Sequence, residues 1–128
     1  MTYYHARTLE TSFDDAVARI TSALAKQGFG VLTDIDIAAT MKKKLGLDMS
    51  PYRILGACNP EMAAKALEVE NKIGTMLPCN VIVRESGPRW VEIAAINPLA
   101  SMSAVGNPKL DQVATKVDAL LRAAVDSA

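Results

Sequence analysis

The C-terminal part of the chain carries its most regular apolar pattern. Asn107-Pro108 has the residue types of a helix start, a capping side chain followed by a proline that needs no N–H partner. Beyond it, apolar residues recur every three or four positions and so share one face of a helix: Leu110, Val113, Val117, Leu120, Leu121 and Ala124. Because burying each Leu or Val contributes about 1.5–3 kcal/mol relative to exposure, this helix is expected to pack on a core.

A second long helix is predicted near the start of the chain. Ser12 followed by Asp15 resembles a capping box, with Asp in place of the usual Glu. Gly28 then supplies the left-handed residue that ends the helix. The apolar positions between them lie on one face: Phe13, Val17, Ile20 and Leu24.

Five strands are predicted around these helices, over 3–8, 30–35, 51–58, 80–85 and 90–96. The last two form a hairpin, because Ser86-Gly87-Pro88 between them is turn chemistry. Shorter helices are predicted over 36–45, 60–70 and 99–105. Five strands and two long amphipathic helices indicate an α+β fold, in which both helices pack on one face of a mainly antiparallel sheet.

Composition indicates one domain over residues 1–128. No linker rich in Pro, Gly or Ser interrupts the chain, and half of its residues are hydrophobic. Fourteen basic and fourteen acidic side chains cancel, so neither nucleic acid nor a membrane surface is expected as a partner. The sequence shows neither a signal peptide nor an apolar run of about 20 residues, so we expect a cytoplasmic protein.

The two cysteines stand where secondary structure changes. Cys58 ends a predicted strand and precedes Asn59-Pro60, which begins a helix. Cys79 follows Pro78 and enters the next strand. If these two strands pair antiparallel, the end of one lies beside the start of the other, and the two thiols are brought close.

These residues also carry a resemblance to a known family. The runs Tyr52–Pro60 and Leu77–Val83, with their Cys-Asn-Pro and Leu-Pro-Cys-Asn-Val motifs, resemble the bacterial and archaeal family named domain-of-unknown-function 302. The resemblance covers nearly the whole chain and implies a curved antiparallel sheet with helices on one face, similar to half of the TATA-binding-protein fold. It implies no reaction. The family usually has Asp-Pro where this chain has Asn97-Pro98, which removes a carboxylate from that position.

In such a sheet, one rim would collect the candidate ligand-binding residues: Cys58, Asn59, Pro78, Cys79, Asn80, Asn97 and Met102. The helix start beside Cys58 favours a thiolate. Directly opposed cysteines on antiparallel strands lie within disulfide range. Two thiols with a nearby thioether are also ligands that suit Cu(I), so Cys58 and Cys79 are the candidate metal ligands.

Structural interpretations compete with each of these features. A free cysteine is often a small core residue, and Asn59 and Asn80 can serve as a cap and a turn residue. His5 is expected to be a partly exposed surface residue, and Trp90 is a candidate for a partner or dimer surface. The sequence contains no nucleophile elbow, phosphate loop or dinucleotide motif, and it identifies no cofactor and no catalytic residue.

The sequence therefore favours a non-enzymatic module that binds a small molecule or a partner, at the cysteine rim or across the open face of the sheet, and forms a homodimer. The alternative is a thiol redox or Cu(I)-handling protein that uses Cys58 and Cys79.

Overall fold

The computed structural model describes residues 2–128. Its elements follow the chain in the order β1 (Tyr4–Glu10), α1 (Phe13–Lys26), β2 (Gly30–Asp36), α2 (Ile37–Leu45), β3 (Tyr52–Cys58), α3 (Pro60–Val69), the 3-10 helix η1 (Ile73–Met76), β4 (Cys79–Gly87), β5 (Trp90–Ile96), α4 (Pro98–Met102), the 3-10 helix η2 (Ser103–Val105) and α5 (Pro108–Ser127). The predicted order of strands and helices is confirmed. β1 extends further than predicted, because its pairing with β5 continues to Glu10 opposite Trp90.

Capping side chains begin the helices where the sequence predicts them. Ser12 Oγ accepts a hydrogen bond from the Asp15 amide at 3.1 Å, and Asn59, Asn97 and Asn107 cap the helices that follow them. The capping box at α1 is incomplete, because the Asp15 carboxylate accepts from the Thr11 hydroxyl at 2.6 Å. Each helix start is thus decided by local sequence.

The five strands form one antiparallel sheet in the order β1-β5-β4-β3-β2. The fold is therefore α+β, as predicted. The register between β2 and β3 shifts between Val31 and Thr33, which leaves Leu32 in a bulge with 67% of its surface exposed. This shift lies beside the end of β3, where Cys58 is located.

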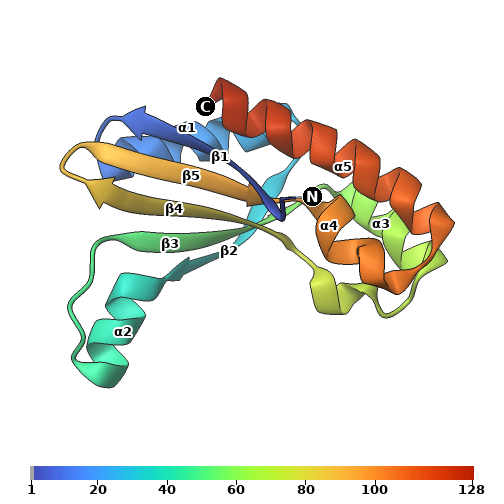
Figure 1. Cartoon of the computed structure of the whole chain (residues 1–128), viewed down its shortest axis with the longest axis horizontal. Helices are drawn as coiled ribbons and strands as arrows, with labels where there is room; N and C mark the ends of the chain where they lie inside the picture. The colour runs from blue at the N-terminus through green and yellow to red at the C-terminus, as the bar shows by residue number, and fades with distance from the viewer. Residues whose placement is uncertain (1) are drawn as a thin grey trace.

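Helices α1 and α5 cover one face of the sheet (Figure 1). Alternate strand residues point toward them into the larger of two buried apolar clusters. Its fully buried members include Ile20 and Leu24 of α1, Leu121 of α5, and Val81 and Ile93 of the sheet. The opposite face carries no helix in the described part of the chain, and we call it the open face.

Helix α2 and the segment after it project away from the sheet, on the side remote from α5 (Figure 1). α2 contains no buried residue, and Leu45, Leu47 and Met49 are 73%, 49% and 39% exposed. We call residues 37–50 the arm. The sequence predicts this helix correctly, but no residue of the helix is fully buried, and Ile37 and Met41 are only half-buried.

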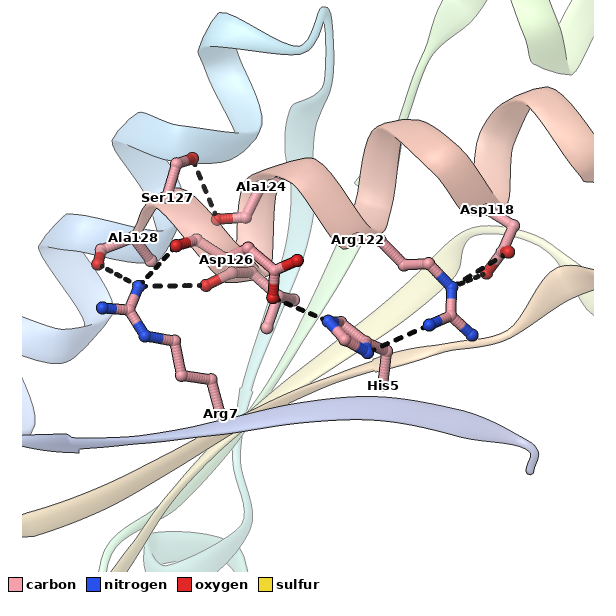
Figure 2. A network of polar contacts seen from close by, with 9 residues as sticks. His5, Arg7, Asp118, Arg122, Ala124, Asp126, Ser127 and Ala128 are labelled. Carbon is pink, nitrogen blue, oxygen red and sulfur yellow. Dashed lines mark hydrogen bonds and ion pairs between the residues drawn. The ribbon is translucent and has the colours of Figure 1, made fainter.

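Polar contacts fasten the end of α5 to β1 (Figure 2). Arg7 Nη1 donates to the carbonyl oxygens of Asp126 and Ala128, each at 2.8 Å. His5 Nε2 lies 2.7 Å from Asp126 Oδ1, and Arg122 Nη1 lies 3.2 Å from His5 Nδ1. Since arginine only donates, Nδ1 accepts and Nε2 carries the hydrogen. His5 thus has a structural role in a half-buried position.

No helix in residues 2–128 is both long enough and apolar enough to cross a membrane.

Candidate functional site

A cavity of about 230 Å³ lies between the ends of β3 and β4 and the helices α3, α4 and α5. We call it the thiol cavity because both cysteines line it. Its lining contains no charged side chain and no histidine: Phe29, Leu32, Ala57, Cys58, Asn59, Met62, Ala63, Ala66, Leu77, Pro78, Cys79, Pro98, Met102, Val113, Ala114 and Val117.

Strand pairing brings the two cysteines to this cavity. β3 ends at Cys58 and β4 begins at Cys79, and the two strands are antiparallel neighbours. The residue opposite Cys79 is Ala57, whereas Cys58 pairs with Gly30 of β2. The expectation that the cysteines stand directly opposite each other is therefore wrong by one residue, although they do share a cavity.

The two thiols differ in their surroundings. Both are free, Cys79 is buried, and Cys58 is half-buried. Burial raises the pKa of the Cys79 thiol to about 11, and the nearby Cys58 adds to the rise. Desolvation disfavours the thiolate, so Cys79 is a neutral thiol at neutral pH and a poor nucleophile.

Asn59 belongs to the cavity wall and also begins α3. Its Oδ1 accepts from the Met62 amide at 3.3 Å. The following Pro60 occupies the first turn of the helix, where no N–H partner is needed. The cap therefore places the N-terminal turn of α3, with Met62 and Ala63, over the end of β3.

Five of the seven candidate residues line the thiol cavity: Cys58, Asn59, Pro78, Cys79 and Met102. Asn80 is exposed and borders a neighbouring hollow of about 290 Å³ that shares Pro78, Cys79 and Met102. Asn97 lines neither space. It is buried, its Oδ1 caps α4, and its Nδ2 donates to the Thr2 carbonyl at 3.1 Å. Its side chain is therefore committed to the fold.

The helical part of the wall includes Val113 and Val117, which the sequence assigned to the apolar face of the last helix. Ala63 and Ala66 come from α3, and Val113, Ala114 and Val117 come from α5. Their helical spacing was visible in the sequence. The signal that could have marked a cavity is the concentration of alanines where the two helices face each other, because small side chains leave space.

Gly56 allows the chain to pass closely beside the cavity. A Cβ atom at this position would lie 2.1 Å from Thr33 Oγ1 and 2.6 Å from Pro78 Cγ. Both distances are far below a normal contact, so only glycine fits between these side chains. This close approach explains why a glycine stands inside β3.

The chemistry available in the cavity is that of apolar contact and sulfur. Two thiols and the thioethers of Met62 and Met102 line the same space. Residues 2–128 contain no group of three or more His, Cys, Asp and Glu side chains that could hold a metal. An apolar cavity of about 150 Å³ is enough to bind benzene or xenon, so the thiol cavity is large enough for a small organic molecule.

Comparison with known proteins agrees with this architecture. Residues 5–128 match the family model described as "Domain of unknown function DUF302". The chain is also similar to an uncharacterized conserved DUF302 protein from Bacillus stearothermophilus, whose crystal structure is known. The two chains are 26% identical with a TM-score of 0.92, and the match covers 99% of this chain and 98% of that chain. No curated protein matches this chain.

Proposed function

This chain belongs to the DUF302 family of domains of unknown function, and we propose that it is a non-enzymatic module that binds a small apolar molecule in the thiol cavity. The observation that carries the proposal is a cavity of about 230 Å³ whose lining residues include no charged side chain. Burial of apolar ligand surface would drive binding. The wall contains no carboxylate, amine or histidine, and the pKa of its buried thiol Cys79 is raised to about 11.

Benzene tests the proposal directly, because it needs only apolar space. We expect benzene to shift the methyl NMR signals of Ala57, Val113 and Val117, which line the cavity. Saturable shifts confined to cavity methyls would support the proposal. A wild-type protein whose methyl signals do not respond would end it.

Two alanines of α3 provide matched variants. Ala63 lines the cavity, whereas Ala64 is exposed on the same helix. Ala63→Leu adds three carbon atoms to the wall, so we expect it to abolish benzene binding. Ala64→Leu makes the same change outside the cavity and should leave binding intact. Equal loss in both variants would show that the effect comes from the helix and not from the cavity.

A second candidate function is Cu(I) handling. It is favoured by one observation, that Cys58, Cys79, Met62 and Met102 line a single cavity. Thiolates and thioethers are soft ligands that select Cu(I). Metal binding would remove the proton from each thiol, including the buried Cys79.

A titration with the Cu(I)–acetonitrile complex against bicinchoninate tests the metal proposal. We expect one Cu(I) per chain and a loss of binding in Cys58→Ser. Met102→Leu should weaken binding, while Met49→Leu is a matched control because Met49 is in the arm. Failure of the wild-type protein to compete with bicinchoninate would exclude the metal role and would not affect the apolar ligand.

A dithiol–disulfide cycle is less well supported than either role. Disulfide formation would pass two electrons and two protons to an external oxidant, and it needs one thiol to attack as a thiolate. Cys79 has a raised pKa, and its strand partner is Ala57 instead of Cys58. Two free thiols are typical of the reducing cytoplasm, where we propose that the protein acts.

We also propose that the protein is a homodimer. The support is the amount of large apolar surface outside the core, which includes Leu32, Ile35, Leu45 and Trp90. Ile35 is paired in register with Ile54 on the open face, and exposed apolar surface of this kind marks interaction sites.

A further inference from the structure

An apolar row crosses the open face from one edge of the sheet to the other. The register aligns one residue from each strand: Ala6, Ala94, Ile82, Ile54 and Ile35. Ile82 occupies the middle of this row, because β4 is the central strand. Ile35, at the β2 edge, is 47% exposed. No helix within residues 2–128 covers this row.

Beside the apolar row runs a polar row whose charges cancel. Arg84 Nε donates to Glu92 Oε1 at 2.7 Å, and the two residues are cross-strand neighbours flanked by Thr8 and Tyr52. Since these charges are already paired, a second sheet stacked on this face would meet no net charge there. The face can therefore pack against an identical copy of itself without repulsion.

The arm and the β1–β5 edge lie at opposite sides of the sheet and carry complementary chemistry. The arm holds exposed Leu45 and the exposed lysines Lys43 and Lys44, which make no ion pair within residues 2–128. At the far edge, Glu10 pairs in register with Trp90, and both are exposed. Each side therefore offers an apolar group next to charged ones: the lysines in the arm, and Glu10 together with the exposed Arg89 at the far edge.

We propose that a second copy of this chain stacks on the open face, with a two-fold axis over Ile82 that runs along the strands. The apolar row of one copy then lies on that of the other. Because this axis exchanges the two edges of the sheet, the arm of each copy reaches the partner's β1–β5 edge, where Leu45 meets Trp90 and Lys43 and Lys44 meet Glu10. The inference rests on the homodimer proposed above and is independent of the cavity ligand.

The flat outline of the surface is smaller than a typical dimer interface before its side chains are counted. Four strand spacings and seven residues of strand outline about 430 Å² of sheet, and nine residues of helix add about 130 Å². Specific interfaces bury about 800 Å² of accessible surface per partner. Side chains that stand out from the flat outline raise its accessible area toward this value. The sheet alone falls well short of that value, which gives the arm a role.

Analytical ultracentrifugation with charge-reversed variants tests the arrangement. We expect wild-type protein to be dimeric. Glu10→Lys and the double variant Lys43→Glu/Lys44→Glu should each raise the dimer dissociation constant about tenfold, because like charges then meet at both ends of the interface. Mixing the two variants should restore wild-type affinity in a heterodimer, since both contacts again join opposite charges.

A change in the apolar row tests the centre of the interface. Ile82→Glu should weaken the dimer about 100-fold or more, because it places a charge in an apolar contact. Thr21→Glu, on the exposed side of α1, is the control and should leave the dimer intact. Circular dichroism checks that both variants are folded.

The outcomes separate the homodimer from its arrangement. A monomeric wild-type protein overturns both. A dimer that tolerates Ile82→Glu in a folded variant, or whose charge variants are not rescued by mixing, overturns this arrangement alone and leaves the homodimer standing on another surface.

Discussion

The two faces of the sheet are built from the same strands but differ in what covers them. On one face, α1 and α5 bury a core that includes Leu121, which is 1% exposed. The open face has a comparable apolar row centred on Ile82, and no element of the described chain lies on it. α5 buries six residues, whereas α2 buries none.

This difference shows that the apolar pattern of a helix does not identify the surface against which the helix packs. Leu45 in α2 and Leu121 in α5 both occupy the apolar face of a helix, and only the second is in contact with a core. The hydrophobic effect favours the removal of apolar surface from water, and it is non-directional, so it does not specify which surface covers which. The covered face therefore contributes to the folding of this chain, and the open face is available for association.

The sharpest test of this comparison replaces one leucine in each helix. Leu121→Ala should lower the free energy of unfolding by about 2–5 kcal/mol, because it removes buried surface and leaves a cavity. Leu45→Ala should change it by less than about 0.5 kcal/mol in dilute, monomeric protein. Urea unfolding measures both values, and equal losses would contradict the assignment of α2 to an uncovered arm.

A second prediction concerns Gly56, where β3 passes between the side chains of Thr33 and Pro78. Gly56→Ala should lower the free energy of unfolding by about 1–3 kcal/mol, because the added Cβ overlaps Thr33 and Pro78. Gly30→Ala is the control, since its Cβ would meet nothing within 4 Å. Adding Thr33→Ala to Gly56→Ala should recover part of the loss; full additivity of the two changes would argue against a direct clash.

The pH dependence of stability tests the burial of Cys79 on the covered side of the sheet. Its folded-state pKa of about 11 lies above the ordinary value of 9.0, so the folded protein holds its proton more tightly than the unfolded chain. This contribution to stability is fully present below pH 9 and is lost as pH rises toward 11. The loss amounts to about 1.4 kcal/mol by pH 10. Cys79→Ala should remove this part of the alkaline decline, and Cys58→Ala should keep most of it, because burial is the larger cause of the raised pKa. A decline that is identical in all three proteins would exclude Cys79 as its source.

The smallest expected effect belongs to the ion pair of Asp34 and Arg53, which joins β2 to β3 next to the arm. The hydrogen bond from Arg53 lowers the pKa of Asp34. Its contribution to stability is therefore present above the ordinary pKa of 3.8 and is lost as pH falls through the lowered value. Because both side chains are partly exposed, a double-mutant cycle of Asp34→Asn and Arg53→Met should give a coupling below about 1 kcal/mol at pH 7, and the coupling should shrink as pH falls below 3.8. A coupling that does not change with pH over this range would show that charge is not its origin.

Local signals explain which parts of the architecture could be predicted. Ser12, Asn59 and Asn107 mark helix starts because a capping oxygen satisfies amides within the same turn. The predicted hairpin of β4 and β5 is present because the two strands are adjacent in sequence, but its turn is at Pro88 and Arg89, and Ser86 and Gly87, which the sequence assigned to the turn, belong to β4. These interactions span a few residues, so the sequence displays them.

The candidate site was predictable only in part, because the sequence does not show the exact register between β3 and β4. The sequence indicated that Cys58 and Cys79 would meet at one end of the sheet, but a shift of one residue sets Ala57 opposite Cys79. Asn97 has the same residue type and setting as Asn59, yet its side chain is committed to Thr2 and α4. Partners so distant in sequence cannot be read from local pattern.

The sequence by itself determined the order of elements, the antiparallel α+β class and the amphipathic faces, because each follows from capping, turn chemistry and periodicity within short segments. Only the tertiary structure decided that α3 and α5 meet through alanines and leave a cavity beside two thiols, and that α2 stands away from the core. The physical reason is that packing depends on the volumes and spacing of side chains from distant segments. A sequence shows which surfaces must leave water; the arrangement of the elements decides where space remains and which surfaces stay uncovered.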